Sequence, residues 1–154
     1  MRKILLAMSA IGASLALAAP AHAEGRAEAR GGVFWGYGDS EATAGIALGY
    51  DWDLGDSAFV GVEASGDKIL AAGYKISFGA TGRLGVKAGE STKIFAAGGY
   101  TTEPCDGCED AWHAGAGIQQ AISGGVYIKA EYRHFFVDGF DDSDAVVGGV
   151  GVAF

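Results

Sequence analysis

The last nine residues, 146–154, read VVGGVGVAF and alternate between two kinds of position. Larger apolar side chains recur at every second position, ending with Val150, Val152 and Phe154, and the positions between them are mostly small. Successive side chains of a β-strand point to opposite faces, so this pattern predicts a strand with one apolar face. The strand is expected to continue to the last residue, an aromatic one.

The same alternation recurs along the chain in segments of about ten residues separated by turn-rich stretches such as 38–41, 53–56 and 138–143. In the second segment, Ile46, Leu48 and Tyr50 share one face, and Gly45, Ala47 and other small residues share the opposite face. Together with the last nine residues, the pattern predicts eight strands at 27–37, 42–52, 57–66, 76–88, 92–102, 111–121, 125–137 and 144–154. The fold class is therefore expected to be all-β.

The composition of the two faces decides which one points outwards. A soluble barrel would carry a dense charged surface, whereas the polar face here consists mostly of Gly, Ala and Ser with charges at intervals. Small residues with a few charges fit a narrow lumen, and aromatic side chains gather near strand ends on the apolar face, as in the girdles of membrane barrels. The sequence thus predicts an eight-stranded antiparallel transmembrane β-barrel. The aromatic positions are Trp35, Tyr37, Tyr50, Trp52, Tyr100, Trp112 and Phe154.

The first 23 residues have the pattern of a secretion signal. Arg2 and Lys3 precede an apolar stretch at 4–17, and 21–23 read AHA, a small-x-small cleavage site. We expect cleavage after Ala23, which leaves a single barrel domain at 24–154. The alternative, a retained membrane helix, would need about 20 apolar residues and no such site.

The charge balance argues against several partners. The mature chain keeps 9 of the 11 basic residues against all 19 acidic ones, a net charge of about −10. Nucleic-acid binding needs clustered Lys and Arg, and docking on anionic lipid needs polybasic patches. We therefore expect no nucleic-acid partner.

The chain resembles the small outer-membrane β-barrel (porin-like, opacity-protein-like) family of Gram-negative bacteria. The resemblance covers the mature chain, and its carriers are AHA at 21–23, AEYRH at 130–134 and the strand ending in Phe154. It implies a place in the cell outer membrane, contact with its lipid and lipopolysaccharide, and recognition by the barrel-assembly machinery. By the same resemblance the assembly signal is formed by Val150, Val152 and Phe154.

Charged residues on the polar faces are expected to meet in the lumen. Side chains fill the interior of an eight-stranded barrel, and a buried charge must be paired. The sequence predicts a network of paired charges that closes the lumen; a polar path for protons or small ions is the alternative. Its expected members are Glu28, Arg30, Glu63, Arg83, Lys87, Lys129, Glu131 and Arg133.

Cys105 and Cys108 flank Asp-Gly, a favoured hairpin turn, in the third outward-facing loop. Opposed strand residues lie within disulfide reach, so an exported protein is expected to form this bridge. A redox-active pair is an alternative that has no thioredoxin-like context here. A zinc site would need two further ligands, and His113 is the one nearby candidate.

The outward loops are acidic, notably at 103–110 and 138–144. The first interpretation is a solvated surface; the second is weak binding of divalent cations shared with lipid phosphates. No metal or cofactor site is predicted.

Three functional classes remain. The first is a structural or surface-interaction barrel without catalytic residues, and the second is a small-solute channel, which a narrow lumen disfavours. The third is a lipid A-modifying enzyme, which needs a nucleophile beside a histidine and a carboxylate. His134 lies on the apolar face beside Arg133 and Phe135 without such a partner in the sequence. The sequence names no extracellular ligand.

Overall fold

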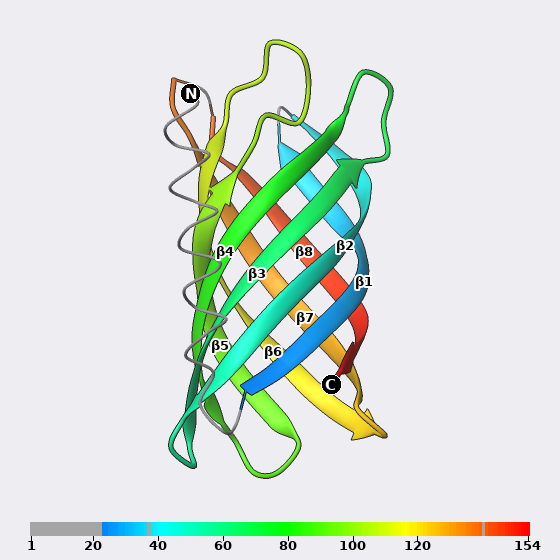
Figure 1. Cartoon of the computed structure of the whole chain (residues 1–154). Coiled ribbons are helices and arrows are strands. Elements are labelled where there is room, and N and C mark those ends of the chain that lie inside the picture. The colour runs from blue at the N-terminus through cyan, green and yellow to red at the C-terminus, as the bar shows by residue number, and fades with distance from the viewer. Residues whose placement is uncertain (1–22, 37, 140) are drawn as a thin grey trace, which may run out of the picture.

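The computed structural model describes residues 23–36, 38–139 and 141–154 (Figure 1). Apart from Ala23, the expected signal peptide lies outside these residues, as does Tyr37. The eight strands are β1 (Ala23–Gly36), β2 (Asp39–Leu54), β3 (Ala58–Ile69), β4 (Ile76–Lys87), β5 (Thr92–Thr101), β6 (Ala111–Ser123), β7 (Val126–Val137) and β8 (Ser143–Ala153).

The strands form one closed antiparallel barrel in chain order, and β1 pairs with β8 to close it. The predicted fold class is therefore confirmed. Four strands, β1, β2, β3 and β6, are longer than predicted. Two of the extensions reach into the charged network of the lumen: β1 begins at Ala23 rather than at residue 27, and β3 continues to Ile69 rather than to residue 66. Both extensions carry charged residues that the alternating apolar pattern does not include.

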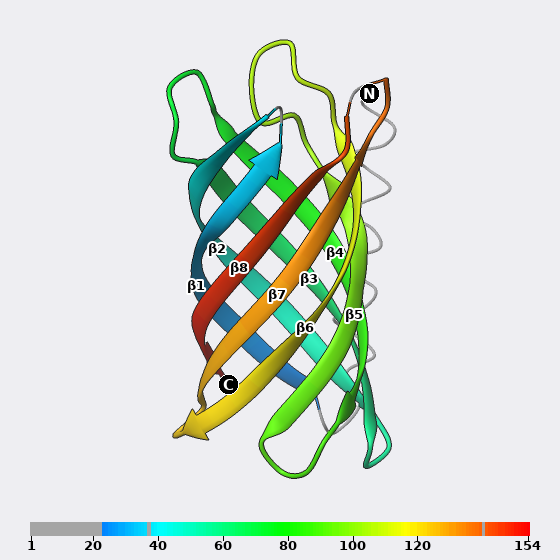
Figure 2. The same ribbon diagram turned by 180° about the vertical axis from the view of Figure 1, so that it is seen from behind.

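The two ends of the barrel differ (Figures 1 and 2). The connections after β1, β3, β5 and β7 lie at one end, which we call the loop end. The C-terminus and the connections after β2, β4 and β6 lie at the opposite, turn end. In the β2–β3 turn, Gly55 has a φ of 73°, a backbone conformation that glycine adopts at no steric cost.

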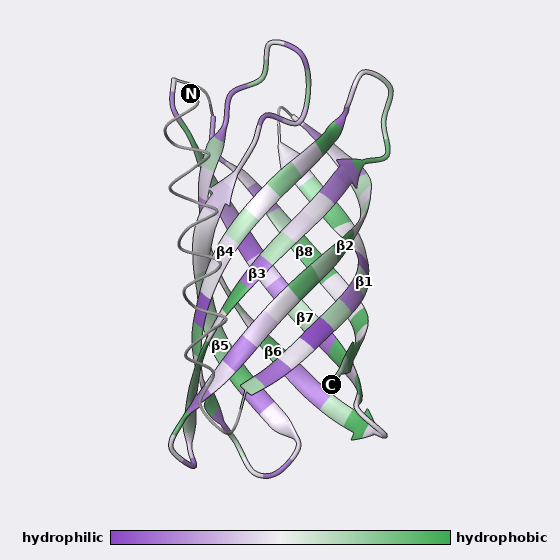
Figure 3. Ribbon diagram, in the orientation of Figure 1, coloured by the Kyte–Doolittle hydropathy of each residue, from purple (hydrophilic) through white to green (hydrophobic). Residues whose placement is uncertain are grey.

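The apolar face of the sheet points outwards. Ile46, Leu48 and Phe78 expose 66%, 62% and 64% of their surface, whereas arginines, lysines and carboxylates are buried inside. Figure 3 shows hydrophobic and hydrophilic residues alternating along the strands. This distribution is the reverse of that in a soluble barrel and matches the lipid-facing band of a membrane barrel.

Aromatic side chains pair on this outer surface near strand ends. The rings of Tyr50 and Trp52 lie 5.1 Å apart, and those of Tyr100 and Trp112 lie 5.3 Å apart. The first pair is towards the turn end and the second towards the loop end, as two interfacial girdles would require.

Apolar clusters occupy the interior towards both ends. The mouth cluster, at the loop end, consists of Phe34, Ile69, Ala145 and Val147. A second cluster at the turn end contains Phe59, Phe95 and Ala97. The charged side chains lie between them. Within the described ranges, no helix is long and apolar enough to cross a membrane.

Candidate functional site

The carboxylate of Glu63, in the middle of β3, is the centre of the lumen. It accepts hydrogen bonds from Arg26 Nη1 at 2.9 Å, Arg30 Nη1 at 2.7 Å and Arg133 Nη2 at 3.1 Å. Lys129 Nζ lies 3.5 Å away. The side chain of Glu63 is 2% exposed, so four cations from β1 and β7 converge on one buried carboxylate.

The network continues towards the loop end through β1 and β3. Arg30 binds Asp67 through Nε at 2.7 Å and through Nη2, a bidentate contact that also fixes the plane of the guanidinium. Ser65 donates a hydrogen bond to the same carboxylate at 3.1 Å. Residues 63, 65 and 67 alternate along β3, so the strand period itself directs these side chains into the lumen.

Strand β7 contributes a second row in the same way. Glu131 accepts from Arg133 Nε at 2.5 Å and lies 3.1 Å from Lys129 Nζ. Lys129 Nζ also lies 2.8 Å from Glu28 of β1. Each charge on β7 therefore has a partner of opposite sign, either two residues along the same strand or on another strand.

Asp51 of β2 extends the network towards the turn end. It accepts from Arg26 Nε at 3.2 Å and lies 3.5 Å from Arg83 Nη2 and 3.3 Å from Lys93 Nζ. The guanidinium of Arg83 stands over the ring of Phe95 at 4.2 Å and that of Phe59 at 5.2 Å. Cation–π contact thus stabilises a buried arginine between the second apolar cluster and the charges.

Glycines on the lumen face make room for these large side chains. A Cβ placed on Gly49 would lie 2.4 Å from the guanidinium of Arg26, and one on Gly149 would lie 2.6 Å from the carboxyl carbon of Glu28. Any larger residue at either position would displace a charged partner. The glycine content of the chain follows in part from the filled lumen.

The structure places the predicted lumen residues unequally. Seven of them, all except Lys87, belong to one connected set of ion pairs around Glu63 and Asp51. Lys87 lies instead near the turn end, half-buried, with its Nζ 2.6 Å from Asp53. The sequence reasoning missed Glu24, Arg26, Asp51, Asp67 and Lys93. Arg26 shares a face with Glu28 and Arg30 in the sequence, which is the signal that would have identified it.

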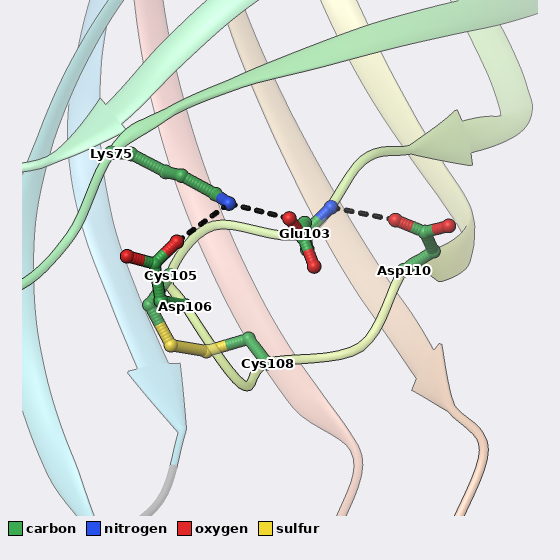
Figure 4. Close-up of a disulfide and its surroundings, with 6 residues drawn as sticks. All are labelled: Lys75, Glu103, Cys105, Asp106, Cys108 and Asp110. Atoms are coloured by element: carbon green, nitrogen blue, oxygen red, sulfur yellow. Dashed lines mark hydrogen bonds and ion pairs between the residues drawn. A yellow bond between two sulfur atoms is a disulfide. The ribbon is translucent and has the colours of Figure 1, made fainter.

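At the loop end, the structure contains the predicted disulfide between Cys105 and Cys108, with Cα atoms 5.2 Å apart (Figure 4). The neighbouring loop after β3 contacts the segment that carries this disulfide. The Nζ of Lys75 in that loop donates to Glu103 at 2.5 Å and to Asp106 at 3.0 Å. These hydrogen bonds, together with the two negative charges, raise the pKa of the Lys75 amine above its usual value.

His113 does not join the cysteines in a metal site. Its side chain is buried in the lumen, with Nε2 3.0 Å from Thr81 Oγ1 and Nδ1 3.0 Å from Thr101 Oγ1. Both ring nitrogens are therefore engaged. Among the residues that the structure describes, no group of three or more His, Cys, Asp or Glu side chains is arranged to hold a metal ion.

Several loop carboxylates bind groups of the protein itself. Asp110 accepts from the Tyr100 hydroxyl. It also accepts from the backbone amide of Glu103 at 2.7 Å, a contact that Figure 4 shows. Asp142 accepts from the backbone amide of Val137 at 3.2 Å. These carboxylates order the loops, a role that the sequence interpretation as a solvated surface does not include.

The comparisons with known proteins give structural neighbours only. No family model matches the chain, and no curated protein matches its sequence. Neisserial surface protein A matches with a TM-score of 0.55 at 16% identity, over 86% of this chain and 97% of that one. Ail, the attachment invasion locus protein of Yersinia pestis, matches with a TM-score of 0.57 at 12% identity, over 86% of this chain and 98% of that one.

The chain has the fold of the small outer-membrane β-barrels.

A third structural neighbour is an enzyme, so the fold alone does not show whether a protein is catalytic. The outer membrane enzyme PagL matches with a TM-score of 0.51 at 19% identity, over 82% of this chain and 98% of that one. Identities this low establish the fold, and function has to be argued from the site.

His134 is the residue at which a catalytic interpretation of this small outer-membrane β-barrel is tested. Its Nδ1 lies 2.8 Å from Asp144 Oδ1, and its Nε2 lies 3.5 Å from Asp142 Oδ2. Tyr132 donates its hydroxyl to the same Asp144 oxygen at 2.5 Å. The carboxylate that the sequence did not reveal is therefore present. However, both ring nitrogens contact carboxylates, and within the described part of the chain neither nitrogen has a recorded contact with a serine, threonine or cysteine that it could activate.

Phe154, one residue beyond the end of β8, extends the pairing of the last strand with β1. The backbone of Phe154 pairs with Gly25 in both directions, with N–H···O distances of 2.9 and 2.8 Å. The side chains of Val150, Val152 and Phe154 all point outwards, and that of Phe154 is 79% exposed. The Phe154 ring is thus largely free of packing within the barrel.

Proposed function

We propose that the protein is exported, loses residues 1–23, and resides in the cell outer membrane as a barrel with a structural or surface-interaction role and no catalytic turnover. In this proposal the outer-membrane lipid surrounds the apolar band. Lipopolysaccharide contacts the loop end, which faces the exterior, and the turn end faces the periplasm. No cofactor, metal or nucleic acid takes part.

One observation carries the proposal: the lumen is filled by a charge-balanced network. Six cations face six carboxylates. The cations are Arg26, Arg30, Arg83, Lys93, Lys129 and Arg133, and the carboxylates are Glu24, Glu28, Asp51, Glu63, Asp67 and Glu131. Removing one partner of a buried pair is costly, so the network favours a single closed arrangement.

The positions of the cavities support a closed lumen. A cavity of about 80 Å³ at the loop end has Arg30 and Arg133 among its lining residues. Another of about 360 Å³ at the turn end is lined in part by Gln119 and Tyr127. The ion pairs of Glu63 and Lys129 lie between these two sets of residues. Solute passage would require the pairs to separate, which argues against the small-solute channel.

Single-channel recording tests this function. The mature chain, refolded into planar bilayers, is expected to give no current steps, while its electrophoretic mobility changes on heating, as expected of a folded barrel. Reproducible steps at either polarity would overturn the closed-lumen interpretation. A shift in the mass of lipid A upon expression would instead establish the enzymatic class.

Recognition by the barrel-assembly machinery is a second part of the proposal. Because the Phe154 side chain is exposed, replacing it should change assembly more than the stability of the finished barrel. We expect Phe154→Ala to reduce the fraction of heat-modifiable protein in cells, while the purified, refolded variant unfolds at the same urea concentration as the parent. Phe136→Ala, which removes another outward-facing aromatic ring, is the matched control. Equal assembly of the parent and both variants would contradict this role.

A further inference from the structure

The loop after β3, residues 70–75, covers part of the barrel mouth. Ala71 and Tyr74 of this loop pack on the mouth cluster, whose side chains include Phe34 and Val147. If the loop moved away, this apolar surface would face water at the loop end, beside the cavity that Arg30 and Arg133 line. The position of the loop therefore decides whether the part of the mouth cluster under Ala71 and Tyr74 is covered.

At the start of the loop, the amide of Leu70 donates to the carbonyl of Ala42 at 2.8 Å. Three further contacts join the loop to the neighbouring segment, residues 103–106. The amide of Lys75 donates to the carbonyl of Pro104 at 2.8 Å, and Tyr74 forms an isolated β-bridge with Cys105. The third contact consists of the ion pairs of Lys75 with Glu103 and Asp106 (Figure 4). The loop is thus held by contacts with residues 103–106, the segment that contains the first cysteine of the disulfide.

The disulfide fixes this fastening. It joins Cys105, which makes the β-bridge, to Cys108, and it encloses Asp106, which binds Lys75. A ring of four residues removes little entropy from an unfolded chain, so its effect on global stability is small compared with that of a disulfide across a long loop. Its main effect is local: it keeps two of the contact residues in place.

We propose that the Cys105–Cys108 disulfide is a thiol-exchange site that controls whether the β3–β4 loop covers the mouth cluster. The co-reactant is a low-molecular-weight thiol. Its thiolate attacks one sulfur and forms a mixed disulfide, and a second thiol then releases that sulfur. Two electrons reduce the Cys105–Cys108 bond, both cysteine sulfurs take up protons, and two molecules of the thiol leave as their disulfide.

Access and energetics agree with this step. Asp106 and Gly107, between the two cysteines, are exposed, and the cysteines themselves are half-buried. After reduction, residues 105–108 are no longer closed into a ring, and the contact with the loop depends on the Lys75 ion pairs and two backbone contacts. Because Cys105 and Asp106 are then less restrained, these contacts break more often and the loop is released more often. The disulfide acts by holding residues 105–108 in the conformation that contacts the loop, and this role needs no oxidoreductase fold around it.

Hydrogen exchange on the refolded mature chain in lipid nanodiscs tests the inference. Adding dithiothreitol is expected to accelerate exchange of the Lys75 amide about tenfold or more, because local opening then requires less free energy. The amide of Val62, in the middle of β3, should be unaffected. A soluble gadolinium chelate should also broaden the methyl signals of Ile69 and Val147 more strongly after reduction.

Two variants separate the disulfide from a general effect of the reductant. Cys105→Ser combined with Cys108→Ser should match the reduced parent and should not respond to dithiothreitol. Glu103→Gln should accelerate Lys75 exchange with the disulfide intact, whereas Glu109→Gln, for which the structure records no ion pair, should not. Unchanged Lys75 protection in the fully reduced parent or in the double variant would overturn the proposal. These measurements use purified protein, so they remain decisive even if the proposed cellular role is wrong.

Discussion

Glu63 shows how a single residue organises the interior of this barrel. An isolated carboxylate in a lumen would be expensive to bury, and so would each of the four cations that surround it. Together they are stable because every charge has a hydrogen-bonded or close partner, within 2.7–3.5 Å of the Glu63 oxygens. Glu63 therefore contributes more to the stability of the barrel than a single ion pair on the surface would.

Glu63→Gln tests this directly. The amide has nearly the same volume but no charge, so Arg26, Arg30, Arg133 and Lys129 lose their common counter-charge. We expect the free energy of unfolding to fall by about 3–5 kcal/mol, the usual cost of removing one partner from a buried pair. Urea titration in lipid vesicles followed by tryptophan fluorescence would measure it. Asp39→Asn, at the exposed start of β2, is the control; equal losses in both variants would contradict the central role of Glu63.

At the scale of the strand, the sequence predicts most of each element but not the ends that carry charge. Alternation locates all eight strands, because period-two patterning depends only on the chain itself. The predicted ranges do not include residues 23–26 and 67–69, because Glu24, Arg26 and Asp67 do not continue the alternation of apolar residues. They are in strands because their partners, Lys93, Glu63 and Arg30, lie on other strands. Pairing between distant strands is not visible in a local pattern.

The loop after β3 is an element whose attachment the sequence does not reveal. Its contact with the disulfide segment gives a pH dependence with a definite sign. The pKa of Lys75 is raised in the folded protein by Glu103 and Asp106. The stabilising contribution is therefore fully present below the unfolded pKa of a lysine, about 10.4. It is lost as the pH rises through the raised folded value.

An NMR titration of Lys75, labelled with ¹³C at Cε, measures this shift. In the parent, the midpoint is expected above that of the variant carrying both Glu103→Gln and Asp106→Asn, because the two carboxylates favour the charged amine. Lys68, for which the structure records no ion pair, serves as the internal reference. A Lys75 midpoint that is the same in the parent and in the double variant would show that the ion pairs do not persist in solution.

At the scale of the whole molecule, two features define the type of barrel: the sheet is closed, and its apolar face points outwards. The sequence predicts eight strands that close into a barrel, because closure leaves no strand edge unpaired. In the structure, β1 pairs with β8. The sequence predicts the central charges as a set, because they share the polar face. It does not show that Lys87 pairs with Asp53 near the turn end, apart from that set, because a face carries no information on depth along the barrel axis.

Arginine substitutions at two depths along the barrel axis test whether the apolar band lies in a bilayer. Leu48 points outwards near the middle of β2, and Ile76 points outwards at the start of β4, at the loop end. If the apolar band lies in a bilayer, Leu48→Arg should lower the free energy of unfolding in lipid vesicles by about 2–4 kcal/mol, and Ile76→Arg by only about 0–1 kcal/mol. The difference arises because a guanidinium near the midplane must be desolvated, whereas one near the interface reaches water. A water-exposed barrel would tolerate both substitutions equally, so equal costs in the two variants would contradict a membrane-spanning band.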